Sequence, residues 1–444
     1  MGKLREFSIQ FTNNTDVFLP GQWITGQVTV DLNDEMKMRG IRLKFQGKGH
    51  VGWTESHQVR RGDQTHTEHR HYRADETYFN QEVTLFGKAS GQSGDNPTLG
   101  AGHHIYPFQY QLPMQGLPTS FEGAHGYIRY SVKGTIDKPW KFDHTTKRAF
   151  TVLDMVDLNQ EPNAMTPLTG QQSKTLCCLC CASGPIELQV QADHSAYCPG
   201  EPIMIRGSVE NNSSSKITKV TAKLKQDVVY HAHYPHHKTR HNSKNLGEVE
   251  GEGCDEGGSV QLNLALPLPA IPPSNLRSCN IIDLTYTLNV SAHFKGAHTS
   301  LDLKFPILVG SIPLRSIYPT APTFPPPPLA PGFDPAYPPP NPGAYPPPNP
   351  AAYPPLNPSA PYPPPGPDAA YPPAPGAPYV PPAGGVAPPI MPAAGTPNLP
   401  PPSYMQSVFG ASSIKDDDDN EHTRGTLDYA PKYTYYDWSQ HPKI

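Results

Sequence analysis

A short proline-tyrosine motif near the C-terminus is the pattern in this sequence best suited to binding chemistry. Pro400-Pro401-Pro402-Ser403-Tyr404 contains the tetrapeptide Pro-Pro-x-Tyr. Prolines hold the backbone in the extended polyproline-II conformation, so little conformational entropy is lost when such a segment docks. Pro401 and Pro402 suit the aromatic-lined groove of a WW domain, and Tyr404 suits the neighbouring pocket. The sequence therefore predicts a WW-domain ligand at Pro401, Pro402, Ser403 and Tyr404, with Tyr433 in Pro431-Lys432-Tyr433 as a degenerate second candidate.

A second motif lies where the proline-rich region begins. Pro319, Thr320, Ala321 and Pro322 match the pattern P-[ST]-A-P. Sequences of this kind resemble late-domain motifs, which bind the ubiquitin-variant domain of the ESCRT machinery. Because the surrounding stretch is rich in Pro, Ala and Thr, a chance match is the competing interpretation.

Four of the seven cysteines are crowded into five positions, at Cys177, Cys178, Cys180 and Cys181. Zinc ligands usually come as spaced pairs from two places, and no second CxxC or HxxxH pair stands at a fitting distance. Packed thiols at a junction between domains and reversible acylation are the two interpretations left open. An odd cysteine count does not suit a disulfide framework, which favours a reducing compartment.

Two histidine groups and one acidic run are weaker candidates for chemistry. His66, His69 and His71 form one group, and His231, His233, His236 and His237 form the other. Both groups lie in hydrophilic stretches that we interpret as hairpin loops with solvated imidazoles, so no metal site is predicted. The acidic run 416–419 is expected to be a solvated spacer.

The sequence contains no motif typical of an enzyme. It lacks a G-x-S-x-G nucleophile elbow, a P-loop, a dinucleotide fingerprint and an HExxH pair. We therefore predict no catalytic residue, no metal and no cofactor. The formal net charge is −4 and basic residues alternate with acids, so no nucleic-acid partner is expected.

The elements that must position these motifs divide into a folded part and a tail. Of the 57 prolines, 37 lie between Pro319 and Pro402, a stretch whose only charges are Asp334 and Asp368. Such a composition cannot bury enough apolar surface to offset chain entropy, which predicts disorder. Tyrosines recur in this stretch every eight or nine residues, in a pattern typical of a stiff polyproline-II spacer.

The first 155 residues carry the pattern of an all-β fold. Short runs in which every second residue is apolar are separated by Gly, Pro or Asn/Asp, as expected for strands with one buried face. Examples are Phe7-x-Ile9-x-Phe11, 27–32, Ile41-x-Leu43-x-Phe45, Tyr106-x-Phe108-x-Tyr110 and Ile128-x-Tyr130-x-Val132. This predicts a β-sandwich of immunoglobulin type.

The second half of the folded part repeats the first. Val17-Phe18-Leu19-Pro20-Gly21 corresponds to Ala196-Tyr197-Cys198-Pro199-Gly200, and both are followed by a strand entered through glycine. The run Tyr127 to Val132 corresponds to Ile282 to Leu288 in the same order. A tandem duplication of one sandwich is therefore predicted.

These residues resemble those of the arrestin domain-containing proteins, the α-arrestins. The first domain carries the resemblance in Phe18-Leu19-Pro20-Gly21, in Pro118-Thr119-Ser120-Phe121-Glu122-Gly123 and in Asp137-x-Pro139-Trp140. The second carries it in Ser183-Gly184-Pro185-Ile186 and in Ile282-x-Leu284-x-Tyr286-x-Leu288. The expected organisation is an arrestin-like N-terminal domain at 1–157, a linker at 158–184, an arrestin-like C-terminal domain at 185–313 and a disordered tail at 314–444.

The resemblance implies an adaptor rather than an enzyme. Such a protein would link receptors or transporters to WW-domain HECT-type ubiquitin ligases for ubiquitylation, endocytosis and endosomal sorting. The N-terminal residues 1–6 lack a signal peptide and a myristoylation signal, so we expect a cytoplasmic protein recruited to the plasma membrane and endosomes.

Two rival functions remain open. A ligase-independent trafficking scaffold would act through residues 319–322 and ESCRT components. An extracellular adhesion protein would use Arg61-Gly62-Asp63 and would require secretion and disulfides. The sequence does not identify the cargo.

Overall fold

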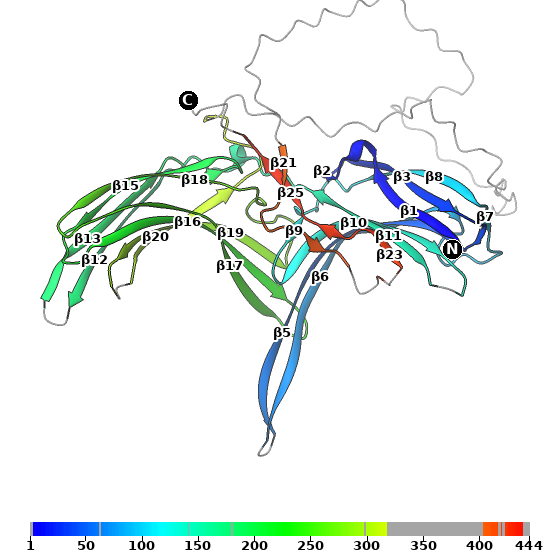
Figure 1. Ribbon diagram of the computed structural model, residues 1–444, viewed down its shortest axis with the longest axis horizontal. Coiled ribbons are helices and arrows are strands. Elements are labelled where there is room, and N and C mark those ends of the chain that lie inside the picture. Colours follow the sequence, from blue (N-terminus) through cyan, green and yellow to red (C-terminus); the bar gives the residue numbers. More distant parts are fainter. Residues whose placement is uncertain are drawn as a thin grey trace, which may run out of the picture. The chain divides into compact units, whose positions relative to one another are not determined.

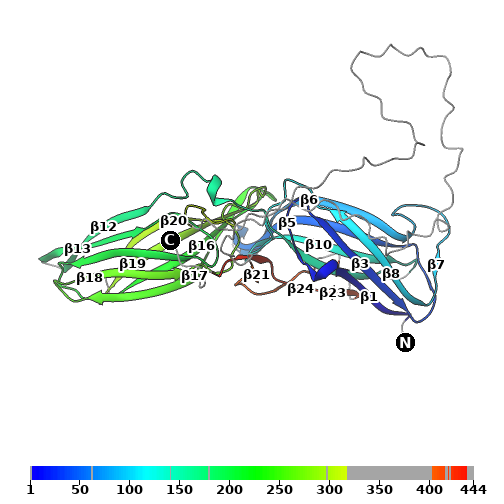
Figure 2. The same ribbon diagram turned by 90° about the horizontal axis from the view of Figure 1, so that it is seen from above.

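Alternating apolar residues in the first part of the chain form two sheets that enclose a common core (Figures 1 and 2). The computed structural model describes residues 3–61, 64–140, 142–178, 181–296, 299–317, 403–415, 419 and 422–437. One sheet has the order β1 (Leu4–Phe11), β3 (Trp23–Leu32), β8 (Gly102–Gln111). The other has the order β2 (Val17–Phe18), β11 (His144–Val152), β10 (Gly126–Asp137), β5 (Gly40–Arg61), β6 (Gln64–Gly87). Shorter strands are β4 (Met36–Lys37), β7 (Thr98–Leu99) and β9 (Phe121–Glu122).

The C-terminal sandwich repeats this arrangement with two sheets of its own. Its first sheet has the order β12 (Leu168–Cys178), β13 (Cys181–Ala192), β15 (Pro202–Asn211), β18 (Ser259–Pro267). Its second has the order β14 (Ala196–Tyr197), β20 (Leu301–Val309), β19 (Ile282–Phe294), β16 (Ile217–Ala232), β17 (Lys238–Cys254). Among the described residues the only helices are single 3-10 turns, η1 (Thr12–Asn14) and η2 (Leu158–Gln160). The predicted all-β fold with two sandwiches is confirmed.

The duplication extends to individual hydrogen bonds. Buried Tyr130 donates its hydroxyl to the carbonyl of Pro118 at 2.7 Å, and buried Tyr286 donates to that of Pro272 at the same distance. The short strands β2 and β14 run parallel to the last strand of their own sandwich, β11 and β20. Both therefore lie at the same topological position, as the repeated Pro-Gly sequence predicted.

A second pair of equivalent contacts involves two buried serines. Ser120 and Ser274 each accept a hydrogen bond on the side-chain oxygen from the last strand, at 2.9 Å from the main-chain N–H of Val152 and Val309. Each serine also donates its own main-chain N–H back to the same residue at 2.9 Å. The two sandwiches therefore share equivalent buried hydrogen bonds as well as the same order of strands.

The segment predicted as a linker at 158–184 contains a strand. β12 pairs with β13 from Leu168 to Cys178, at the edge of its sheet. Its residues 169–174 are polar and mostly exposed, so the apolar alternation that marks a half-buried strand is missing. Apolar periodicity therefore does not predict an edge strand of this kind.

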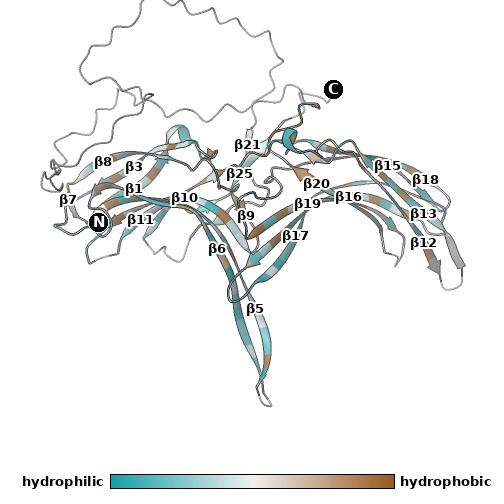
Figure 3. Cartoon of the chain, turned by 180° about the vertical axis from the view of Figure 1, so that it is seen from behind, coloured by the Kyte–Doolittle hydropathy of each residue, from teal (hydrophilic) through white to brown (hydrophobic). Residues whose placement is uncertain are grey.

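The first histidine group lies on a strand of a long hairpin and not in a loop, whereas His233, His236 and His237 lie in the loop between β16 and β17, as predicted. β5 and β6 extend far beyond the neighbouring strands, and the outer part of this hairpin is largely hydrophilic (Figure 3). His66, His69 and His71 belong to β6, and His231 belongs to β16. Side chains on this outer part are mostly exposed on both faces, so again no apolar period reveals the strands.

Candidate functional site

The C-terminal segment returns to the N-terminal sandwich and extends one of its sheets. β23 (Thr423–Thr426) runs parallel to β11, with Thr145 opposite Thr423 and Arg148 opposite Thr426 (Figure 1). At Gly425, whose φ is +108°, a Cβ atom would lie 2.2 Å from the carbonyl oxygen of Lys147. Only glycine permits this close approach of the two main chains.

Three buried tyrosines attach the last part of this segment. Tyr429 donates its hydroxyl to the carbonyl of Phe150 at 3.2 Å, and Tyr433 donates to that of Ser120 at 3.1 Å. Tyr436 donates to the carbonyl of Ser311 at 2.7 Å, which belongs to the C-terminal sandwich. Burial raises the pKa of all three phenols, so they remain protonated donors.

The sequence did not predict that these three tyrosines anchor the segment, and Tyr433 was singled out only as a degenerate WW candidate. The available signal was the aromatic-rich run 429–436, since aromatic residues favour strands and buried surfaces. The structure assigns residues 403–415 and 422–437 to turns, short strands and surface contacts, although the sequence placed them in the disordered tail at 314–444. The proline-rich part of that tail lies outside the described residues.

A row of three lysines crosses the sheet beneath the segment. Lys133 on β10 lies directly opposite Lys44 on β5 and opposite Lys147 on β11. Lysines that face each other in this way repel. They line a cavity of about 190 Å³ together with the further basic residues Arg42 and Lys48.

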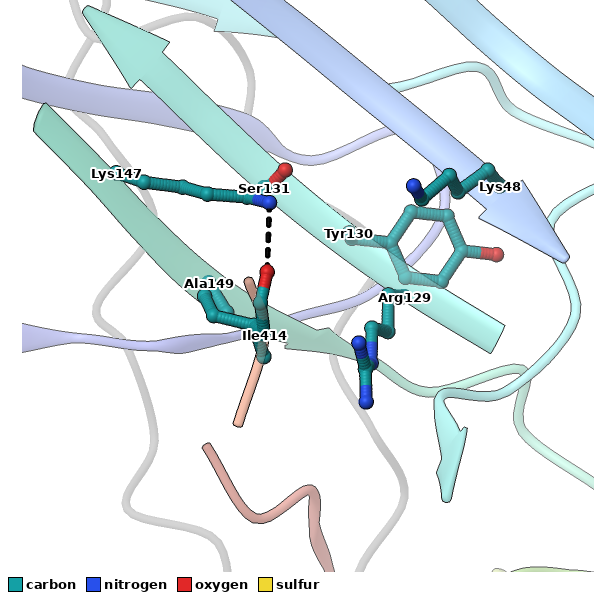
Figure 4. A pocket seen from close by; sticks show the side chains of 7 residues that line it. All are labelled: Lys48, Arg129, Tyr130, Ser131, Lys147, Ala149 and Ile414. Atoms are coloured by element: carbon teal, nitrogen blue, oxygen red, sulfur yellow. Dashed lines mark hydrogen bonds between the residues drawn. The ribbon is translucent and has the colours of Figure 1, made fainter. Parts of the chain in front are cut away.

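Asp419 neutralises part of this row. Its carboxylate lies 2.6 Å from Nζ of Lys133 and 3.5 Å from Nζ of Lys147, and its side chain is only 1% exposed. Lys147 also donates to the main-chain carbonyl of Ile414 at 2.8 Å (Figure 4). The prediction that run 416–419 is a solvated spacer is therefore wrong for Asp419, and residues 416–418 lie outside the described residues.

The WW-type motif is held by the same segment. Ser403 and Tyr404 belong to β21 (Ser403–Gln406), which pairs with β25 (Lys432–Tyr435) so that Tyr404 lies opposite Thr434. The side chain of Tyr404 is 41% exposed, and burial of the remainder raises the pKa of its phenol. Pro401 and Pro402 lie outside the described residues.

Tyr433, the degenerate second candidate, is only 1% exposed. Its ring is therefore inaccessible to a WW domain in this conformation.

Two further short strands, β22 (Ser412–Ser413) and β24 (Asp428–Tyr429), pair with each other within the segment.

Several predicted site residues cannot be compared with the structure. The late-domain-like residues Pro319, Thr320, Ala321 and Pro322 lie outside the described residues, as do Cys180 and the side chains of Cys177, Cys178 and Cys181. Gly62 and Asp63 of the adhesion tripeptide are also outside them. The interpretations given to these residues stay predictions.

The described histidines make pairwise contacts. His231 lies 2.7 Å from a carboxylate oxygen of Asp283, and its ring centroid lies 6.1 Å from that of His237. Within the described ranges, no group of three or more His, Cys, Asp or Glu residues has a geometry that could hold a metal ion. At His144, burial and the nearby Lys138, His422 and Arg424 lower the pKa of the imidazole to about 4.

Comparison with known proteins identifies the two sandwiches. Residues 7–159 match the sequence model of the arrestin (or S-antigen) N-terminal domain, and residues 182–314 match that of the C-terminal domain. The chain belongs to the α-arrestin family. It is 30% identical over 321 residues to arrestin domain-containing protein 17 of Caenorhabditis elegans, covering 71% of this chain and 72% of the relative.

Other relatives cover similar shares of this α-arrestin. Arrestin domain-containing protein 4 of Mus musculus is 30% identical over 318 residues, and this match covers 70% of the present chain and 73% of the relative. Arrestin domain-containing protein 1 of Homo sapiens is 30% identical over 340 residues, and this match covers 76% of the present chain and 70% of the relative. Family membership supports a general role as a trafficking adaptor rather than an enzyme. In the part of the chain that the structure describes, no helix has the length and apolar composition needed to cross a bilayer.

Proposed function

We propose that this α-arrestin links membrane cargo to a WW-domain ubiquitin ligase of the HECT type. The observation that carries the proposal is the tetrapeptide Pro401-Pro402-Ser403-Tyr404, placed after two arrestin domains. The sandwiches would contact a receptor or transporter at the plasma membrane or an endosome. The motif would recruit the ligase, which would then ubiquitylate lysines of the cargo or of the adaptor itself.

Recognition of the motif depends on Tyr404. In a WW complex the prolines occupy a groove between aromatic rings, and the tyrosine enters a second pocket where its hydroxyl donates a hydrogen bond. A single motif gives weaker binding than a pair, because no second site raises the effective concentration. We therefore expect modest affinity for an isolated WW domain and a complete dependence on the tyrosine ring.

A pull-down of the full chain with isolated WW domains of a HECT-type ligase tests the proposal. Tyr404→Ala is expected to abolish capture. Tyr362→Ala is a matched control, because Tyr362 follows a single proline in Ala360-Pro361-Tyr362 and lacks the Pro-Pro-x-Tyr spacing. Capture of Tyr404→Ala at the wild-type level would exclude this motif as the ligase contact.

A second candidate function uses Pro319, Thr320, Ala321 and Pro322. The agreement of these residues with P-[ST]-A-P favours a trafficking scaffold that reaches ESCRT components without a ligase. This function predicts that Pro322→Ala changes vesicle localisation in cells while Tyr404→Ala leaves it unchanged. The opposite result would leave the ligase adaptor as the supported function.

A further inference from the structure

We propose that the C-terminal segment blocks access to the WW ligand. β25 pairs with the main-chain edge of β21, so a WW domain can bind only after β21 has separated from β25. This inference rests on the proposed function, since it concerns access to the same motif. We call the paired strands β21 and β25 the clasp. In the closed state Tyr404 belongs to a two-stranded sheet, and in the open state it is free to enter a WW pocket.

The two states are mutually exclusive for geometric reasons. The clasp pairs Ser403 with Tyr435 and Tyr404 with Thr434, and Ser403 also donates its hydroxyl to the carbonyl of Tyr435 at 3.1 Å. A WW domain must surround the motif in the polyproline-II conformation and enclose the tyrosine ring. With β25 paired along one edge of β21 and Tyr404 only 41% exposed, a WW domain could reach no more than the uncovered part of the tyrosine ring.

The two strands of the clasp are attached with unequal strength. On β25, the side chains of Tyr433 and Thr434 are 1% and 3% exposed, and Lys432 reaches the carboxylate of Asp16 at 2.7 Å. All four residues of β21 are exposed. Opening should therefore release β21 and leave β25 on the sandwich.

The connection after β21 adds a few contacts that hold the clasp closed. Ser407 donates its main-chain N–H to the carbonyl of Pro431 at 2.8 Å. The ring of Phe409 lies 3.9 Å from Nζ of Lys244 on β17, in a cation–π contact. A two-stranded sheet of four residues is marginal by itself. The closed state should therefore lower the apparent WW affinity without abolishing it.

A reversible disulfide across the clasp tests this inference. Residues directly opposite each other in an antiparallel pair have Cα atoms about 4.5 to 5.5 Å apart, within the range that a disulfide spans. Ser403→Cys combined with Tyr435→Cys should therefore form a bond that locks β21 onto β25. Position 403 is the variable residue of Pro-Pro-x-Tyr, so this substitution leaves the motif intact.

WW binding to the full chain is measured by fluorescence anisotropy with the disulfide oxidised and reduced. Because apparent affinity scales with the open fraction, the oxidised form is expected to bind at least about tenfold more weakly than the reduced form. The single variants Ser403→Cys and Tyr435→Cys control for the native cysteines, and neither should respond to reduction.

A second pair of variants opens the clasp instead. Ser407→Pro removes the main-chain N–H that bonds to Pro431, and it lies three residues after Tyr404. Ser407→Ala keeps that N–H and is the matched control. Ser407→Pro is expected to bind the WW domain several-fold more tightly than Ser407→Ala and to approach the affinity of a synthetic peptide covering 397–408.

The outcomes separate this inference from the proposed function. If the peptide binds, but oxidation and Ser407→Pro leave the affinity of the full chain unchanged, the clasp does not control access and the inference is wrong. If the peptide itself fails to bind the WW domain, the proposed function fails and this inference fails with it.

Discussion

The last strand of the N-terminal sandwich, β11, and the last strand of the C-terminal sandwich, β20, occupy equivalent positions but have different neighbours. Both receive a short parallel strand, β2 or β14, at their C-terminal ends. β11 is also paired along residues 145–148 with β23 from the end of the chain. Among the described residues no strand is added at the corresponding part of β20.

The charges on the two sheets differ at the same place. The row Lys44, Lys133, Lys147 crosses the N-terminal sandwich, whereas the equivalent row of the C-terminal sandwich is Lys223, Asn289, Lys304. The central lysine is therefore replaced by an amide that donates to the hydroxyl of Ser291 at 3.2 Å. The C-terminal sandwich needs no buried carboxylate there, and the N-terminal one obtains Asp419 from more than 250 residues away.

The two sandwiches therefore share their inner framework and differ on the outer face of one sheet. The tyrosine and serine contacts that close each core are the same. The outer sheet of the first sandwich became a binding surface for the chain's own C-terminal segment. Changes at Asp419 or Tyr433 should therefore affect the first sandwich more than the second, whereas Tyr436 contacts the second.

The largest expected effect comes from removing the most deeply buried anchor of the segment. Replacing Tyr433 by Ala leaves a cavity at the surface of the N-terminal sandwich and should lower its free energy of unfolding by about 3–5 kcal/mol. Hydrogen exchange should accelerate in β11 far more than in β13. Tyr433→Phe, which keeps the ring, should lose only about 1 kcal/mol because it removes a single hydrogen bond. Equal acceleration in both strands would mean that the segment stabilises the two sandwiches alike.

The next effect tests what the two sandwiches share. Tyr130→Phe and Tyr286→Phe each leave a proline carbonyl without its buried donor, which should reduce stability by about 1–3 kcal/mol. Because both donor–acceptor distances are 2.7 Å, the two losses should be similar in denaturant unfolding followed by circular dichroism. Tyr286→Phe should lose somewhat more, because the Tyr286 hydroxyl also accepts a hydrogen bond from the side-chain amide of Gln226 at 3.3 Å. A loss confined to one variant would show that the frameworks are similar in geometry but not in energy.

The inner framework was predictable from the sequence because its signals are local. The apolar alternation around Tyr130 indicates which face of the strand is buried. The repeated Pro-Gly turns at Gly21 and Gly200 indicate where strands begin. Both glycines have positive φ, at 79° and 92°, as a turn of this kind requires. The polar edge strand β12 and the outer half of the β5–β6 hairpin carry no such signal, since neither has a buried face.

The contacts of the C-terminal segment were beyond sequence reasoning for a different reason. Asp419 lies within an acidic run, and its burial depends on two lysines that are distant in sequence. Tyr404 could be proposed as part of a WW ligand from its sequence neighbours alone. That it pairs with Thr434 follows only from the place where Tyr433 and Tyr436 anchor the other strand.

A smaller effect is expected from the charges that distinguish the two outer faces. Asp419→Asn removes the carboxylate from the lysine row and should destabilise the N-terminal sandwich by about 1.5 kcal/mol, as for other hydrogen bonds to charged groups. Asn289→Lys would recreate three facing lysines in the C-terminal sandwich without an acid, at a cost of about 0.2–1 kcal/mol. Thermal unfolding at low and high salt measures both. The loss for Asn289→Lys should shrink as salt rises, because repulsion among the more exposed lysines of that sandwich is screened. The loss for Asp419→Asn should change little with salt, because Asp419 and Lys147 are 1% and 5% exposed. A salt-independent loss for Asn289→Lys would contradict the electrostatic explanation.

The smallest effect concerns the ion pair that joins β25 to the loop before β2. Asp16 and Lys432 lie 2.7 Å apart, and their side chains are about one-third exposed, at 36% and 32%. A pair this exposed should contribute only about 0.2–1 kcal/mol. The swap Asp16→Lys with Lys432→Asp should restore whatever either single change loses, as measured by a double-mutant cycle of thermal unfolding. A coupling well above 1 kcal/mol would mean that charge attaches the segment as strongly as the buried tyrosines do. A small coupling would leave the buried tyrosines as the main attachment of the segment, through Tyr429 and Tyr433 to the first sandwich and through Tyr436 to the second.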